Sequence, residues 1–141
     1  MFNKKYEDRL RAWREFRLTL ESSNDPITDV ICFYSKAPMV SIQVDPWEPK
    51  SWLGPWELLY ENNYCEFSKI LAICYTLQLT DSFSDAKFQI HICTNSQNSE
   101  SKYLLYIDKK VIGYDYDSVI DVTELPKLLR TEVVYDMPKL Q

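Results

Sequence analysis

Three side chains in this sequence could form a thiol nucleophile with its supporting groups: Cys65, His91 and Asp108. Cys65 falls at the expected start of a helix, where unpaired backbone N–H groups and the helix dipole stabilise a thiolate. His91 is the only histidine, and it lies in an expected strand from which an imidazole could accept the thiol proton. Asp108 follows at the end of the neighbouring strand and could orient that imidazole, with Asp115 and Asp117 as alternatives for the acid. The order predicts a cysteine nucleophile with a base and an orienting acid.

A packing interpretation of the same residues stays open beside the catalytic one, and the residue types favour it. Glu66 follows Cys65 directly, and its negative charge disfavours a nearby thiolate. Asp108 lies in an expected turn, where aspartate is favoured by turn geometry alone. In this interpretation Cys65 fills a helix start, and His91 makes an ordinary hydrogen bond on the surface of the sheet.

Metal and nucleotide sites are not expected. The four cysteines, Cys32, Cys65, Cys74 and Cys93, contain no CxxC pair and are accompanied by a single histidine, so the spacing of a zinc site is missing. Only two glycines occur, which excludes both the Walker loop and the dinucleotide fingerprint. We therefore expect neither a metal ion nor a cofactor.

Length and composition indicate one globular domain. The 141 residues are 45% hydrophobic and 26% charged, enough apolar side chain for a packed core. We expect a helical arm over about residues 1–37 and a mixed body over about 38–141. The net charge of -5 disfavours nucleic acid as a partner. The charged N-terminus and the lack of a long apolar run predict no signal peptide, no membrane partner and a cytosol-like compartment.

Apolar spacing predicts two helices at the start of the chain. Residues 3–22 carry large apolar side chains at steps of three and four, with a basic excess on the remaining faces. Asp25 followed by Pro26 is typical of an N-cap and a first helical position, so a second helix is expected from there to Pro38.

The middle of the chain mixes a strand, a loop and two helices. Met39–Val44 alternates loosely enough to predict a short strand. Residues 45–57 hold prolines, a glycine and three tryptophans, which indicates an ordered loop. One helix is expected from Pro55 and a longer, largely buried one from Cys65.

The last third changes to a period of two, which predicts a sheet. Phe88–Cys93, Tyr103–Ile107 and Val111–Tyr114 are expected to form antiparallel strands, the last two joined by a hairpin turn. A short helix at Thr123–Leu129 and a final strand at Glu132–Tyr135 complete the pattern. The class is therefore α+β, with helices packed on one face of a small antiparallel sheet.

The order of a helix-start cysteine, a strand histidine and an acid resembles the papain-like and transglutaminase-like superfamily of thiol enzymes over about residues 55–115. The resemblance implies that Cys65 is the nucleophile, His91 the general base and Asp108 the orienting acid. The backbone N–H of Cys65 would then serve an oxyanion hole. The implied function is that of a cysteine-dependent amide hydrolase or acyltransferase.

A second set of motifs spans most of the chain: Trp13–Phe16, DPW at 45–47, WLGPWELL at 52–59, YCEF at 64–67 and CYTLQLT at 74–80. Together they resemble a family of small uncharacterised proteins of tailed cyanophages. This resemblance implies a virion component such as a neck, tail or baseplate protein, made in the host cytoplasm and then built into the virion. Its partners would be other virion proteins in a homo- or hetero-oligomeric assembly.

With this resemblance, the residue types favour a protein–protein docking module over a thiol enzyme. Tryptophan, tyrosine and arginine dominate the energetic centres of protein interfaces. The expected binding residues are three tryptophans of the loop and two arginines of the first helix: Trp47, Trp52, Trp56, Arg9 and Arg14.

Overall fold

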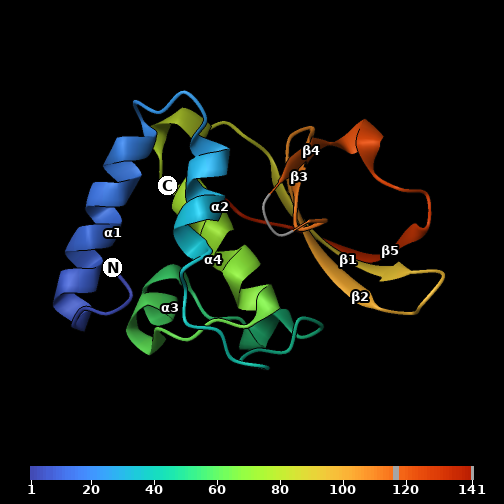
Figure 1. Cartoon of the computed structure of the whole chain (residues 1–141), viewed down its shortest axis with the longest axis horizontal. Helices are drawn as coiled ribbons and strands as arrows, with labels where there is room; N and C mark the ends of the chain where they lie inside the picture. Colours follow the sequence, from blue (N-terminus) through green and yellow to red (C-terminus); the bar gives the residue numbers. More distant parts are fainter. Residues whose placement is uncertain (116–117, 141) are drawn as a thin grey trace.

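The computed structural model describes residues 1–115 and 118–140, and in this part of the chain it contains four α-helices and one five-stranded sheet (Figure 1). The helices are α1 (Tyr6–Leu20), α2 (Pro26–Tyr34), α3 (Pro55–Glu61) and α4 (Glu66–Gln78). The strands are β1 (Phe88–Asn95), β2 (Ser101–Ile107), β3 (Lys110–Ile112), β4 (Val119–Asp121) and β5 (Leu129–Asp136). Three 3₁₀ turns complete the elements: η1 (Pro49–Ser51), η2 (Asp81–Phe83) and η3 (Val122–Glu124). The predicted α+β class is confirmed.

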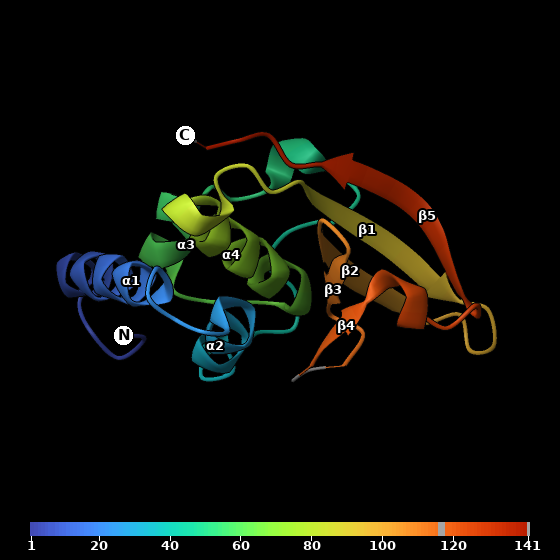
Figure 2. The same cartoon turned by 90° about the horizontal axis from the view of Figure 1, so that it is seen from above.

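The helices gather in one half of the molecule and the sheet forms the other (Figure 2). The helix α4 lies between the two halves and contacts α2, α3 and β2. After β5 the C-terminal segment returns toward the helices, where the side-chain amide of Gln78 donates to the carbonyl of Pro138 at 2.9 Å. No helix within the described residues is long and apolar enough to cross a bilayer.

The helix α4 is central because apolar or small side chains occupy nearly all of its faces. Every residue from Ile70 to Gln78 is buried, which is the pattern of a helix surrounded by protein. Cys65 is its N-cap, in an extended conformation, and the Cys65 N–H donates to Ser68 Oγ at 2.8 Å. The predicted buried helix beginning near Cys65 is therefore confirmed.

One hydroxyl attaches α1 and α2 to α4. The indole Nε1 of Trp13 donates to Thr76 Oγ1 at 3.0 Å, and the hydroxyl of Tyr34 lies 2.9 Å from the same oxygen. All three side chains are buried. These contacts hold both N-terminal helices against the central one.

The two predicted N-terminal helices are confirmed with shorter bounds. For α2, the Asp25 carboxylate accepts the Thr28 N–H at 3.3 Å, and Pro26 occupies the first helical position. This helix ends at Tyr34, before the expected stop at Pro38.

The sheet is antiparallel throughout, with the strand order β4-β3-β2-β1-β5. In β1 and β2, Phe88 stands opposite Ile107, and both belong to the main core with the helices, as does Ile90. Cys93 and Leu104 belong to a second, smaller cluster on the other face. The predicted hairpin and the packing of helices on one sheet face are thus present.

One prediction for the C-terminal region is wrong, and one strand there was missed. The helix expected over Thr123–Leu129 is only the turn η3, whose start is capped by the Asp121 carboxylate accepting the Thr123 N–H at 3.2 Å. Pro126 has no N–H to continue a helix from this turn. The strand β4 was not predicted, because three residues are too few to show a period.

The strand expected at Met39–Val44 is also wrong. Its only pairing is a single parallel bridge between Met39 and Tyr64, in which the Val40 N–H donates to the Tyr64 carbonyl at 2.8 Å. The segment that contains Tyr64 enters α4 directly after this residue. Its next backbone groups are therefore not available to extend the bridge into a β-ladder.

Substitution of Gly113 measures how tightly the chain after β3 packs on β2. Its φ is +107°, and a Cβ at this position would lie 2.3 Å from the carbonyl oxygen of Tyr103. We expect Gly113→Ala to lower the free energy of unfolding by about 2–4 kcal/mol, because backbone strain and a steric clash add. Gly54→Ala is the matched control, with negative φ and an ordinary contact, and should cost about 1 kcal/mol or less. Equal losses in denaturant titrations of the two variants would contradict this packing.

Candidate functional site

Cys65 lies among hydrogen-bond donors at the start of α4. Its Sγ is 3.5 Å from the Ser68 N and 3.4 Å from the Ser68 Oγ. The backbone N–H groups of Val44 and Gln43 also favour its ionised form. The Cys65 side chain is only 4% exposed. The local geometry expected for a stabilised thiolate is therefore present, in a buried position.

These donors outweigh the effect of burial on the thiol. Burial raises the pKa of Cys65, whereas the Ser68 hydroxyl and the N–H groups of Ser68, Val44 and Gln43 lower it, and the net pKa lies below the ordinary value of 9.0. Burial alone acts on the thiol of Cys74, further along the same helix, and raises its pKa. Of the two cysteines next to or within α4, only Cys65 has a pKa shifted toward the thiolate form.

His91 lies on the face of the sheet that points away from the helices. Its ring stacks on Tyr106 with centroids 3.7 Å apart, and Tyr106 packs against the smaller cluster. Its Nε2 is 3.3 Å from the Gln89 side-chain oxygen, while Nδ1 is buried without a hydrogen-bond partner. Burial lowers the pKa of His91, and Asp136 only partly opposes this. The imidazole is therefore neutral at neutral pH.

Asp108 binds the backbone before β1 at one end of the sheet and does not orient His91. It lies in the turn between β2 and β3 with φ of 50°. Its carboxylate accepts the Lys87 N–H at 2.9 Å, and its own N–H donates to the Lys87 carbonyl at 2.9 Å. Lys87 precedes β1, and at about 3.3 Å per residue it lies roughly 13 Å from His91 along the strand.

The structure does not bring the three predicted catalytic residues together. Cys65 packs in the main core on the helix side of the sheet, whereas His91 lies on the opposite side. This corrects the predicted triad, because the backbone of β1 stands between the thiol and the imidazole. Asp115 borders a cleft on the helix side, and Asp117 lies outside the described residues.

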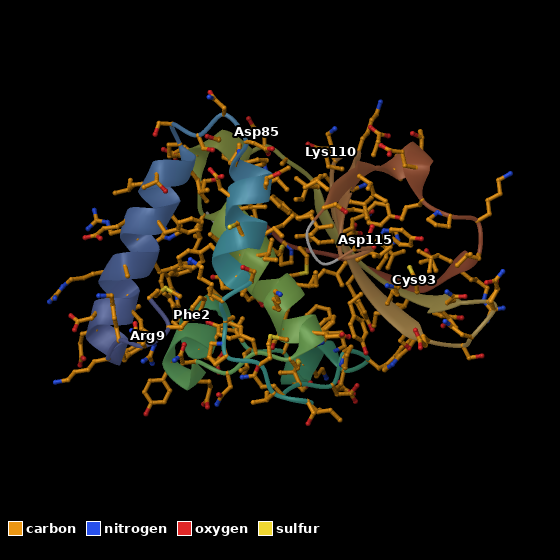
Figure 3. All side chains as sticks on the ribbon, viewed as in Figure 1. Phe2, Arg9, Asp85, Cys93, Lys110 and Asp115 are labelled. Carbon is orange, nitrogen blue, oxygen red and sulfur yellow. The ribbon has the colours of Figure 1, made fainter. Side chains whose placement is uncertain are left out.

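Arg9, expected to contact a partner, is instead a buried structural residue (Figure 3). Its guanidinium donates to the carbonyls of Leu59 at 2.9 Å, Tyr60 at 3.0 Å and Lys4 at 2.6 Å. The first two carbonyls belong to the last turn of α3, whose acceptors have no helical partner. Arg9 therefore fastens α1 to the end of α3, whereas Arg14 is exposed on α1.

The three loop tryptophans differ in their surroundings. Trp47 and Trp56 are 52% and 51% exposed. Trp52 is half-buried, and its ring lies 4.9 Å from the ring of Phe67 and 4.9 Å from that of Tyr135. Trp52 thus joins the loop to α4 and β5, and only Trp47 and Trp56 of this group present large open surfaces.

Other exposed apolar side chains in this region were not singled out from the sequence. Tyr60 is 65% exposed and lies one helical turn after Trp56, so the helix predicted from Pro55 already places both on one face. Ile42 is 82% exposed. The alternation around Ile42 had predicted a strand, which concealed its exposure.

Metal ligation has no support among the described residues. Within residues 1–115 and 118–140, no three His, Cys, Asp or Glu side chains gather closely enough to hold an ion.

The role of Arg9 can be measured against that of Arg14. Arg9→Ala should lower the free energy of unfolding by about 2–4 kcal/mol, since it leaves buried carbonyls of α3 without donors. Arg14→Ala should change it by about 0.5 kcal/mol or less, as is usual for an exposed side chain. The two variants are compared by denaturant titration. If Arg9→Ala is as stable as Arg14→Ala, the structural role of Arg9 is contradicted and Arg9 is again a candidate binding residue.

No protein-family model and no curated protein matches this chain. No shared family therefore supplies a function for these residues, and what the chain does has to be inferred from its own contacts and exposed surfaces.

Proposed function

We propose that this chain is a structural or assembly protein of a tailed-phage virion and acts as a protein–protein docking module. Its docking surface is the exposed apolar part of residues 39–60, here called the aromatic segment. The members of this surface are Met39, Val40, Ile42, Trp47, Trp56 and Tyr60. The proposal includes a place in the neck, tail or baseplate, in contact with other virion proteins.

The observation that carries the proposal is the concentration of exposed apolar side chains in this one stretch. Most of the large hydrophobic side chains exposed in the described chain belong to the aromatic segment. The loop before α3 and α3 itself both lie at the lower edge of the molecule in Figure 1. Concentrated exposed apolar surface of this kind marks interaction sites in soluble proteins.

The aromatic rings of α3 are held in place before any partner binds. Trp56 meets Trp13 edge to face with centroids 5.2 Å apart, and Tyr60 meets Tyr6 in the same way at 5.3 Å. Each ring is thus supported from its own chain while about half or more of its surface stays open. Side chains fixed in this way lose little conformational entropy on binding, which favours their use as anchors.

The loop around Trp47 is ordered by its own hydrogen bonds. The Asp45 carboxylate accepts the Trp47 N–H at 2.9 Å, and the Asp45 carbonyl accepts the indole N–H of Trp52 at 3.2 Å. Trp52 in turn packs on α4 and β5. Trp47 therefore stands on a rigid support although no helix or strand contains it.

The separation of Cys65 from His91 favours docking over the alternative of an amide hydrolase or acyltransferase. A buried thiol on the other side of the sheet from the only histidine lacks the imidazole that the predicted thiol mechanism uses as proton acceptor. Within the described residues, the aromatic segment supports binding at least as strongly as any other feature supports amide hydrolysis or acyl transfer.

The docking role predicts that single tryptophan variants fail to enter particles. Epitope-tagged Trp47→Ala and Trp56→Ala chains are expected to be about tenfold or more depleted in purified phage particles, since truncating an anchor typically costs about 2 kcal/mol of binding. Leu18→Ala is the matched control, because Leu18 is an exposed apolar residue of α1 outside the aromatic segment. Circular dichroism confirms that each variant is folded.

Two outcomes would contradict the docking role. Folded Trp47→Ala and Trp56→Ala chains could enter particles as well as the unchanged chain, or the Leu18→Ala control could be depleted to the same extent. Absence of the unchanged chain from particles would contradict the virion assignment.

A further inference from the structure

A cleft lies between the helices and the sheet, where the chain after β3 passes α2 and α4. Its cavity volume is about 100 Å³, below the roughly 300–1,000 Å³ of drug-sized sites, so only a small ligand fits. Asp115, labelled in Figure 3, lies at this border between the two halves of the molecule. The cleft is independent of the proposed docking surface except for Met39, which borders both.

The floor of the cleft is apolar and branched. Ile31 from α2, Ile70 and Ile73 from α4 and Ile112 from β3 all line it, and each is buried. The close approach of Gly113 to the Tyr103 carbonyl fixes the wall formed by the chain after β3. This floor suits the hydrocarbon part of a ligand.

The two lysines of the cleft are more buried residues than its two acidic residues. Lys69 and Lys102 are half-buried, whereas Glu66 and Asp115 are exposed at the rim. Charges on exposed residues are screened by water, so the carboxylates of Glu66 and Asp115 oppose a ligand anion only weakly. The lining therefore favours a negative group on the ligand although its formal charges balance.

Lys69 is available to such a group. No carboxylate of the described residues forms an ion pair with it, and no hydrogen bond to its ammonium is present there. Lys102 already donates to the Tyr114 carbonyl at 3.0 Å and lies 5.5 Å from the Tyr114 ring centroid, which leaves it further donors. The hydroxyl of Tyr103, whose pKa is raised by burial and by Glu66, stays protonated at neutral pH and can donate as well.

We propose that this cleft binds a small amphiphilic anion, with its hydrocarbon part on the isoleucine floor and its acidic group paired with Lys69. Lys102 and Tyr103 supply additional donors for the same acidic group. The shared chemistry is a short apolar chain ending in a carboxylate or phosphate.

Three probes with the same hydrocarbon chain separate the charge effect from the apolar effect: hexanoate, hexanol and hexylammonium. Each is titrated into the full chain and followed by the backbone amide resonances of Gly113 and Tyr103. We expect hexanoate to bind in the millimolar range and about three- to fivefold more tightly than hexanol, as a half-buried ion pair provides. Hexylammonium should bind most weakly.

Substitution of Lys69 assigns the effect to its ammonium group. In Lys69→Met the advantage of hexanoate over hexanol should disappear while the affinity for hexanol is unchanged. Lys87→Met, an exposed lysine outside the cleft, is the control and should keep that advantage. A parallel titration with hexyl phosphate distinguishes the two kinds of acidic group.

Three results would overturn the proposal. They are the absence of amide shifts around the cleft with hexanoate, tighter binding of hexylammonium than of hexanoate, and an unchanged hexanoate advantage in folded Lys69→Met. None of these results depends on entry into virions, so the cleft and the docking role can fail separately.

Discussion

One buried oxygen, Thr76 Oγ1, joins both N-terminal helices to the central helix α4. The Thr76 hydroxyl donates to the Ala72 carbonyl at 2.7 Å, so both of its lone pairs are left to accept from Trp13 and Tyr34. A buried indole or phenol without a partner would be costly, and this hydroxyl satisfies both at once. It fixes α1 and α2 on α4 and thereby places Arg9 at the end of α3. The support beneath the exposed ring of Trp56 is the same Trp13 that Thr76 holds.

The sidedness of β1 decides what Cys65 can do. Alternation in the sequence placed His91 on the side opposite to Phe88 and Ile90, and the structure agrees. Because the apolar side of the strand meets the helices, and Cys65 begins one of those helices, His91 has to face away from the thiol. The pattern that located each residue correctly thus also contained the information against the triad. What the alternation could not show is the stacking of His91 on Tyr106, which depends on the neighbouring strand.

The surface was less predictable than the elements. The spacing of apolar residues predicted α1, α2 and α4, because burial of one helix face requires that spacing. Exposure of single side chains depends on contacts distant in sequence: Trp52 packs on Phe67 and Tyr135, whereas Trp47 finds no such cover. Arg9 was assigned to the exposed faces of the helix because of its charge, although its steps of three and four from Tyr6 and Trp13 place it on the same stripe as these two residues. The cleft beside Lys69 combines α2, α4 and β3, and no local pattern predicts it.

The central claim, that the sheet separates Cys65 from His91, is tested most directly by titrating the Cys65 thiol. Its thiolate absorbance is obtained as the difference between the unchanged chain and Cys65→Ser, first alone and then in the His91→Gln background. The account predicts a pKa below 9.0 that is the same in both backgrounds. Ser68→Ala removes a hydrogen-bond donor to the thiolate and should raise the pKa of Cys65. This variant is the positive control, because it shows that the titration detects a change in that pKa. A rise of about one unit or more in His91→Gln, the effect of losing a cation next to a thiolate, would contradict the account.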